Sequence, residues 1–131
     1  MTTASLSILL AEDDASNRKV TLLMLRRLGY HADVAVDGME VLRAIERRLY
    51  DVVLMNIRMP KMDGIEATRK IRMRWQDRPK IVAFTAYVLP GIKESCLEAG
   101  MDDYLGKPVK LDELAAMLEK HKPRFQEAWG E

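Results

Sequence analysis

Short apolar runs alternate with segments of helical periodicity along almost the whole chain, and this alternation limits the folds that the chain can adopt. The runs cover residues 6–11, 32–36, 51–55, 80–85 and 101–105. The third run is nearly all apolar, as expected for a strand that is covered on both faces. We therefore expect five strands, with the third covered on both faces of the sheet.

The segments between these runs carry apolar residues three and four positions apart, which is the spacing of one helix face. Residues 111–118 show this spacing most clearly. Ser16 and Asp63 are the expected N-caps of the first and third helices, because their oxygen atoms can accept from free backbone N–H groups. Five strands alternating with five helices predict an α/β fold, with a parallel sheet and helices on both faces.

The length and the charge of the chain limit its organisation and its partners. We expect residues 1–131 to form a single domain, with a core over about residues 6–122 and a short tail at 123–131. The formal net charge of +1 gives no sign of a nucleic-acid or anionic-membrane partner. No apolar stretch approaches the ~20 residues that span a bilayer, and no basic secretory leader is present. The single cysteine, Cys96, excludes an internal disulfide and favours a cytoplasmic location.

Polar residues follow the predicted strands at the edge of the sheet where ligands bind in such folds. Neighbouring carboxylates repel each other and favour a hard divalent cation such as Mg²⁺. A lysine and a hydroxyl opposite them would suit a phosphoryl group. Each residue alone would be an ordinary cap or strand end, so the prediction of a joint phosphoryl and metal site depends on their occurring together. They are Glu12, Asp13 and Asp14 after the first strand, Asn56 after the third, Thr85 at the end of the fourth and Lys107 after the fifth.

The segments that carry these residues resemble the motifs of response-regulator receiver domains, the phosphoacceptor modules of two-component signalling. The resemblance extends from about Leu6 to Lys120, and the motifs are ILLAEDD, VVLMNIRMPKMDG, FTAY and DDYLGKP. It implies a doubly wound, flavodoxin-like fold with strand order 2-1-3-4-5. It also implies a role in phosphorelay signal transduction, without enzymatic turnover.

The resemblance assigns a Mg²⁺ site to residues after the first and third strands. Asp13 would be a direct ligand, and Glu12 would act largely through water. The side chain at position 56 and the backbone carbonyl of Arg58 would complete the protein ligands.

The resemblance also assigns the phosphoryl chemistry and the switch. An aspartate at position 56 would accept the phosphoryl group from a histidine kinase. Thr85 would bond a phosphoryl oxygen, Lys107 would pair with its charge, and Tyr104 would be the aromatic switch residue that follows Thr85. The Lys107–Pro108 peptide is expected to be cis, since only X-Pro bonds adopt this form at low cost.

Asn56 departs from the family at the one position that performs chemistry. Its amide has no nucleophilic oxygen anion, so it should not accept a phosphoryl group. Its carbonyl would attract Mg²⁺ only weakly, and the lost charge beside Glu12 and Asp13 should stabilise the metal-free form. Asn56 is either natural, in a pseudo-receiver that serves as a phosphorylation-independent scaffold, or an engineered replacement that fixes the inactive form. The otherwise intact site favours the engineered replacement.

The expected partners are proteins. The resemblance implies that a sensor histidine kinase or a phosphotransfer domain docks near the first helix, at residues 17–28. We expect a stand-alone receiver, with no output domain after residue 122. The resemblance implies that it would signal through the face formed by the fourth helix, the fifth strand and the fifth helix, at residues 90–97, Tyr104 and 110–118. A homodimer is left open.

Two enzyme classes on related folds are disfavoured. A flavodoxin-like redox protein needs a loop that cradles phosphate after the first strand, where residues 12–14 are acidic and would repel it. A haloacid-dehalogenase-type phosphatase would need additional residues for its cap, and the spacing of Thr85 and Lys107 fits a receiver better.

Overall fold

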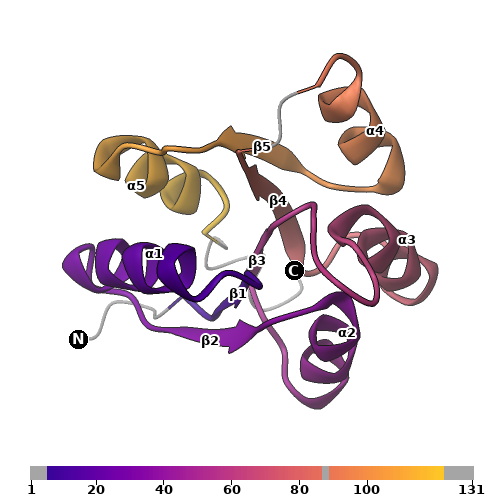
Figure 1. The fold of residues 1–131 in the computed structure, drawn as a ribbon. Coiled ribbons are helices and arrows are strands. Elements are labelled where there is room, and N and C mark those ends of the chain that lie inside the picture. The colour runs from indigo at the N-terminus through magenta and orange to yellow at the C-terminus, as the bar shows by residue number, and fades with distance from the viewer. Residues whose placement is uncertain (1–5, 87–88, 123–131) are drawn as a thin grey trace.

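The computed structural model describes residues 6–86 and 89–122, and the predicted tail at 123–131 lies outside the described residues. Strands and helices alternate strictly within the described residues (Figure 1). The strands are β1 (Ile8–Ala11), β2 (Ala32–Ala35), β3 (Val52–Met55), β4 (Lys80–Thr85) and β5 (Asp103–Gly106). The helices are α1 (Ala15–Arg27), α2 (Gly38–Arg47), α3 (Gly64–Arg74), α4 (Ile92–Ala99) and α5 (Leu111–Lys120).

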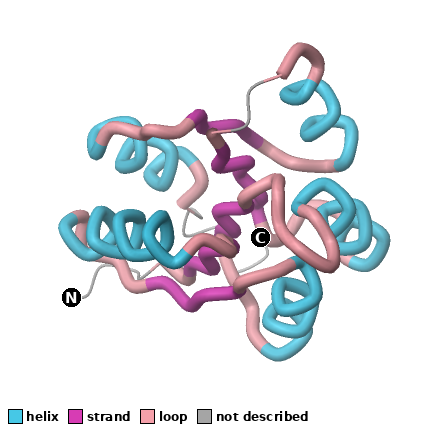
Figure 2. Tube along the Cα trace, in the orientation of Figure 1, coloured by secondary structure: helices cyan, strands magenta, loops and turns pink. Residues whose placement is uncertain are grey.

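The five strands form one parallel sheet in the order β2-β1-β3-β4-β5 (Figure 2). The predicted doubly wound fold is therefore confirmed. The chain moves outward from β1 to β2 and then crosses back to β3, so the direction of winding changes between β1 and β3. Ligands in such sheets bind beside this change, at the carboxyl ends of the strands.

Two hydrophobic cores lie on opposite faces of the sheet. Helices α1 and α5 cover one face, and α2, α3 and α4 cover the other (Figure 1). Successive residues of a strand point to opposite faces, so Leu10 and Leu54 pack toward α1 and α5, whereas Leu9 and Val53 pack toward the other three helices. All four residues of β3 are 0% exposed, which accounts for the nearly unbroken apolar run in the sequence.

Aspartates cap the first three helices. The predicted cap Asp63 is confirmed, because its Oδ1 accepts from the Glu66 N–H at 2.8 Å. The predicted cap Ser16 is wrong. Helix α1 begins at Ala15, so Ser16 already lies in its first turn, and Asp14 is the N-cap, with its Oδ1 accepting from the Asn17 N–H at 2.9 Å.

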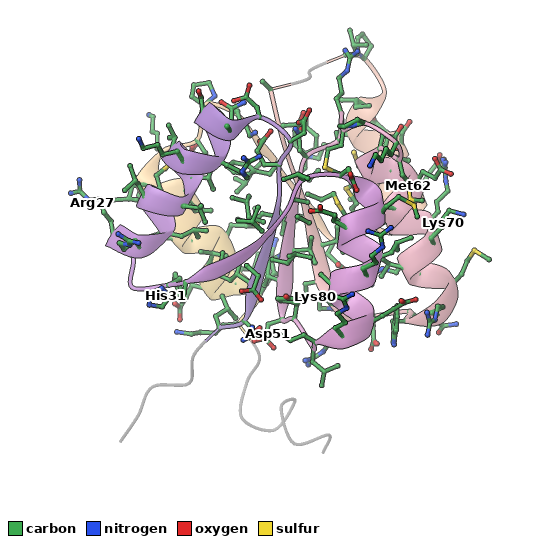
Figure 3. All side chains as sticks on the ribbon, turned by 60° about the horizontal axis from the view of Figure 1, so that its bottom comes forward. Arg27, His31, Asp51, Met62, Lys70 and Lys80 are labelled. Carbon is green, nitrogen blue, oxygen red and sulfur yellow. The ribbon has the colours of Figure 1, made fainter. Side chains whose placement is uncertain are left out.

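The two ends of the strands lie on opposite edges of the molecule. His31, Asp51 and Lys80 lie before or at the start of three strands and mark one edge in Figure 3, whereas Met62, in the loop after β3, lies away from that edge. The loops that carry the predicted site follow the carboxyl ends of the strands. Among the described residues, no helix has the length and apolarity needed to cross a membrane.

The loop between β3 and α3 packs closely against the residues that follow β3. The Gly64 N–H donates to the Ile57 carbonyl at 2.7 Å, and the Thr68 hydroxyl donates to the Gly64 carbonyl at 2.8 Å. A Cβ atom on Gly64 would collide with the backbone carbonyl oxygen of Asn56 and approach Met55 Cγ to 2.8 Å. This position therefore admits only glycine, and its close packing fixes the backbone of Asn56.

We predict that Gly64→Ala lowers the free energy of unfolding by about 2 kcal/mol or more, because the backbone at Asn56 cannot move aside without disturbing β3. Chemical denaturation measures the change. Gly106→Ala is the matched control, since an added Cβ there meets no atom within 4 Å, and it should stay within about 0.5 kcal/mol of the parent. Equal stability of the two variants would contradict this account of the turn.

Candidate functional site

The predicted residues from β1 and β3 meet at the carboxyl edge of the sheet. The ladder continues one step beyond the strands, because the Glu12 N–H donates to the Ala35 carbonyl at 2.9 Å and the Asn56 N–H donates to the Ala11 carbonyl at 3.0 Å. These two bonds place the side chains of Glu12 and Asn56 next to each other, although they are 44 positions apart in the chain.

The Asn56 amide nitrogen lies at the centre of a group of oxygen atoms. Nδ2 is 2.9 Å from Glu12 Oε2, 3.3 Å from Asp13 Oδ1 and 3.2 Å from the carbonyl oxygen of Arg58. An amide NH₂ group has only two hydrogens for these three acceptors. Its partial positive charge therefore sits where several oxygens converge, and these oxygens belong to the residues that the sequence predicts as Mg²⁺ ligands.

These oxygen atoms are suitable ligands for a hard cation. Mg²⁺ is usually bound by one or two carboxylates together with waters, and here the exposed carboxylate of Asp13 adjoins the buried carboxylate of Glu12 and the Arg58 carbonyl. Within residues 6–86 and 89–122, no three His, Cys, Asp or Glu side chains are grouped to hold a metal. A site here would therefore rely on these two acids, neutral oxygens and water.

Lys107 reaches the same acidic residue from the loop after β5. Its Nζ pairs with Glu12 Oε1 and lies 4.9 Å from the centroid of the Phe84 ring. The side chains of Lys107 and Glu12 are only 13% and 1% exposed. The Lys107 N–H donates to the Thr85 carbonyl at 2.9 Å, and the Lys107–Pro108 peptide is cis, as predicted.

Both oxygens of the Glu12 carboxylate are therefore engaged. Oε1 pairs with the Lys107 ammonium, whereas Oε2 accepts from the Asn56 amide and from the Asp14 N–H at 3.2 Å. A buried carboxylate is stable only when such partners compensate for its lost hydration. Here these partners are the Lys107 ammonium, the Asn56 amide and the Asp14 N–H.

Thr85 and Tyr104 lie on adjacent strands beside this cluster. Thr85 ends β4 with 1% exposure and pairs in register with Gly106, whereas Tyr104 pairs with Ala83. The half-buried Tyr104 packs against the core on the side of α2, α3 and α4, and burial raises the pKa of its phenol. The structure thus brings Thr85 next to the Lys107 backbone. Tyr104 lies on the neighbouring strand, two residues before the partner of Thr85 in the ladder.

Arg18 is a contact of the site that the sequence analysis did not identify. Its Nη1 donates to the carbonyl of Glu12 at 3.0 Å and to that of Asp13 at 3.2 Å. The available signal was a cation in the first turn of a helix, where the helix dipole disfavours positive charge. Asp14, by contrast, was grouped with the acids but serves as the cap of α1.

The family model described as response regulator receiver domain matches residues 8–119. The chain is 46% identical over 126 residues to Histidine protein kinase 1 of Candida albicans, covering 88% of this chain and 5% of that protein. It is 40% identical over 118 residues to the aerobic respiration control sensor protein ArcB of Escherichia coli, covering 88% of this chain and 15% of that protein. The chain thus spans only a small part of these curated relatives.

Solved structures with the same fold include a receiver domain and a chemotaxis protein. The receiver domain of sensor histidine kinase PA1611 from Pseudomonas aeruginosa, which has a magnesium ion coordinated in its active-site cleft, aligns with a TM-score of 0.82 at 46% identity. The alignment covers 89% of this chain and 97% of that one. Chemotaxis protein CheY4 of Vibrio cholerae aligns with a TM-score of 0.81 at 28% identity, covering 89% and 98% of the two chains.

We predict that Asn56→Asp lowers the free energy of unfolding of the metal-free protein by about 1 to 2 kcal/mol. The substitution replaces a hydrogen-bond donor by a third carboxylate beside Glu12 and Asp13. Millimolar Mg²⁺ should restore the loss in the variant and change the parent little, because a ligand stabilises only the state that binds it. Denaturation with EDTA and with Mg²⁺ measures both effects.

Asn17→Asp is the matched control, since it makes the same chemical change on the exposed surface of α1. Its stability should not depend on Mg²⁺. A metal-free Asn56→Asp protein as stable as the parent would contradict the role given to the amide.

Proposed function

Since the chain belongs to the family of response regulator receiver domains, we propose that it is a phosphorelay receiver in which Asn56 blocks the phosphoacceptor position. The contact of the Asn56 amide with both Glu12 and Asp13 carries this proposal, because it identifies position 56 as the side chain that faces the acid pair. In a receiver with an aspartate here, the attacking oxygen would lie beside the cation ligands. In this chain no nucleophile is present at that point.

We propose Mg²⁺ as the cation of this site, bound by Asp13, by Glu12 largely through water, by the Arg58 carbonyl and weakly by Asn56. The cation would neutralise the negative charge of an incoming phosphoryl group. Asn56 presents its NH₂ group to the other ligands, so its amide would have to turn to offer Oδ1. This requirement lowers the expected affinity for Mg²⁺.

We propose that Thr85 and Lys107 bind the phosphoryl oxygens, with Tyr104 as the switch residue. The backbone hydrogen bond between Lys107 and Thr85 supports a common site. Lys107 would have to exchange its partner, Glu12, for the phosphoryl group. The half-buried position of Tyr104 leaves it room for a more buried arrangement.

The proposed phosphodonor is a histidine kinase or a phosphotransfer domain, in keeping with relatives that are named as histidine kinases. Helix α1 begins at the acid pair and exposes Val20 and Leu23 to 57% and 51%. This apolar surface beside the site supports docking there. We propose a cytoplasmic setting, which suits the buried thiol of Cys96.

The proposed output surface is the face of α4, β5 and α5, which includes Tyr104 and the exposed Leu97. A phosphoryl group in the site would bias this face toward a second arrangement. A downstream protein or a second copy of the chain would bind it. We propose one receiver domain over the chain, within which these surfaces act together.

A phosphorylation-independent scaffold is the second candidate. It is favoured by one observation, the contacts of the buried Glu12 carboxylate with the side chains of Lys107 and Asn56. Such a scaffold would bind its partner equally with and without Mg²⁺ or a phosphoryl analogue. An asparagine codon in the source genome would support it, whereas an aspartate codon would support an engineered replacement.

We predict that acetyl phosphate with Mg²⁺ does not phosphorylate this chain and does phosphorylate the Asn56→Asp variant, because only a carboxylate can form the acyl phosphate. Intact-mass spectrometry measures the addition of one phosphoryl group. The Asn17→Asp variant should remain unmodified, as a control for nonspecific transfer. A stable phosphoryl group on the parent chain at residue 56, or an inert Asn56→Asp variant, would refute the proposed site.

A further inference from the structure

We propose that Arg18 is a positioning residue for the cation site, an inference that rests on the proposed function. Its Nη1 atom donates to two consecutive backbone carbonyls, those of Glu12 at 3.0 Å and Asp13 at 3.2 Å. One guanidinium nitrogen thus binds the two peptide units from which the acid pair projects. Arg18 does not contact either carboxylate in these hydrogen bonds, so its effect on the cation is indirect.

The place of Arg18 in α1 is electrostatically unfavourable without these bonds. It lies in the first turn, after the N-cap Asp14, and its own N–H donates to the Asp14 carbonyl. Positive charge is favoured at the other end of a helix, where Arg26 and Arg27 occupy the last turn of α1. The two bonds to the loop carbonyls compensate for this location.

The loop after β1 needs such a contact. The bond from the Glu12 N–H to the Ala35 carbonyl continues the sheet at this point. Beyond it, Arg18 fixes the Glu12 and Asp13 carbonyls, and the Asp14 N–H in turn binds Glu12 Oε2. The direction of both carboxylates therefore depends on the two hydrogen bonds from Arg18 to the loop.

Positioning and charge predict opposite effects on Mg²⁺ affinity. The guanidinium is a positive charge near the site, so its removal would tighten Mg²⁺ binding if charge were its only influence. If Arg18 orients the acid pair, its removal weakens binding instead. Removal of an outer partner of a metal ligand typically costs about tenfold or more in affinity.

The test measures Mg²⁺ affinity by calorimetry in the Asn56→Asp background. We expect Arg18→Ala to weaken binding about tenfold and Arg18→Lys to recover part of the loss, because an ammonium keeps the charge and can donate to one carbonyl. Lys19→Ala is the matched control. It removes the same charge from the next residue, which is exposed and makes no side-chain hydrogen bond among the described residues, and its affinity should be unchanged or slightly tighter.

A second readout uses the metal-free parent chain. Arg18→Ala should accelerate hydrogen exchange of the Asp14 N–H, and thermal unfolding confirms that each variant is folded. Equal or tighter Mg²⁺ binding by the Arg18→Ala double variant would overturn the role of Arg18 alone. If Asn56→Asp itself bound no Mg²⁺, the proposed function would be overturned, and the role of Arg18 with it.

Discussion

The arrangement of the site depends on one buried carboxylate. Glu12 is 1% exposed, and its two oxygens are compensated by the ammonium of Lys107 and by the amide of Asn56. Without these partners a charge in this position would cost several kcal/mol. Because the partners lie 95 and 44 positions away in the chain, this single charge joins the ends of β1 and β3 to the loop after β5. The carboxyl edge of the sheet is therefore a connected unit, and a change at any of the three residues should be felt by the other two.

In a receiver with an aspartate at position 56, this connection would allow a cation and a phosphoryl group to act together. A cation beside Asp13 would compete with the Asn56 NH₂ group for the same oxygens. A phosphoryl group would compete with Glu12 for Lys107. Each ligand would thus displace one of the contacts seen here, those of the Asn56 amide or that between Lys107 and Glu12. In the proposed switch, the equilibrium between two arrangements would depend on this exchange of partners, and the backbone bond from Lys107 to Thr85 would transmit it to β4 and β5.

Most of the fold, and the proximity of the candidate site residues, could be predicted from the sequence, since both depend on strong local signals. Strands β3 and β4 are apolar runs with clear ends, and the polar residues that follow the strands meet because parallel strands share one carboxyl edge. The start of α1 could not be predicted in the same way. Asp14 and Ser16 can both cap a helix, and the choice depends on the path of the preceding loop. The role of Arg18 was missed because its one signal, a cation in the first turn of a helix, does not indicate which backbone carbonyls its side chain binds.

The structure also bears on whether Asn56 is natural or engineered. An intact set of site residues favours a recent, engineered replacement only if those residues have no purpose without phosphorylation. The Glu12 carboxylate contacts both Lys107 and Asn56, so a natural pseudo-receiver would have a structural reason to keep these three residues. An asparagine at position 56 both removes the nucleophile and supplies a hydrogen-bond donor to Glu12 and Asp13, so the loss of phosphorylation and the new contact with the acid pair are expected to be inseparable.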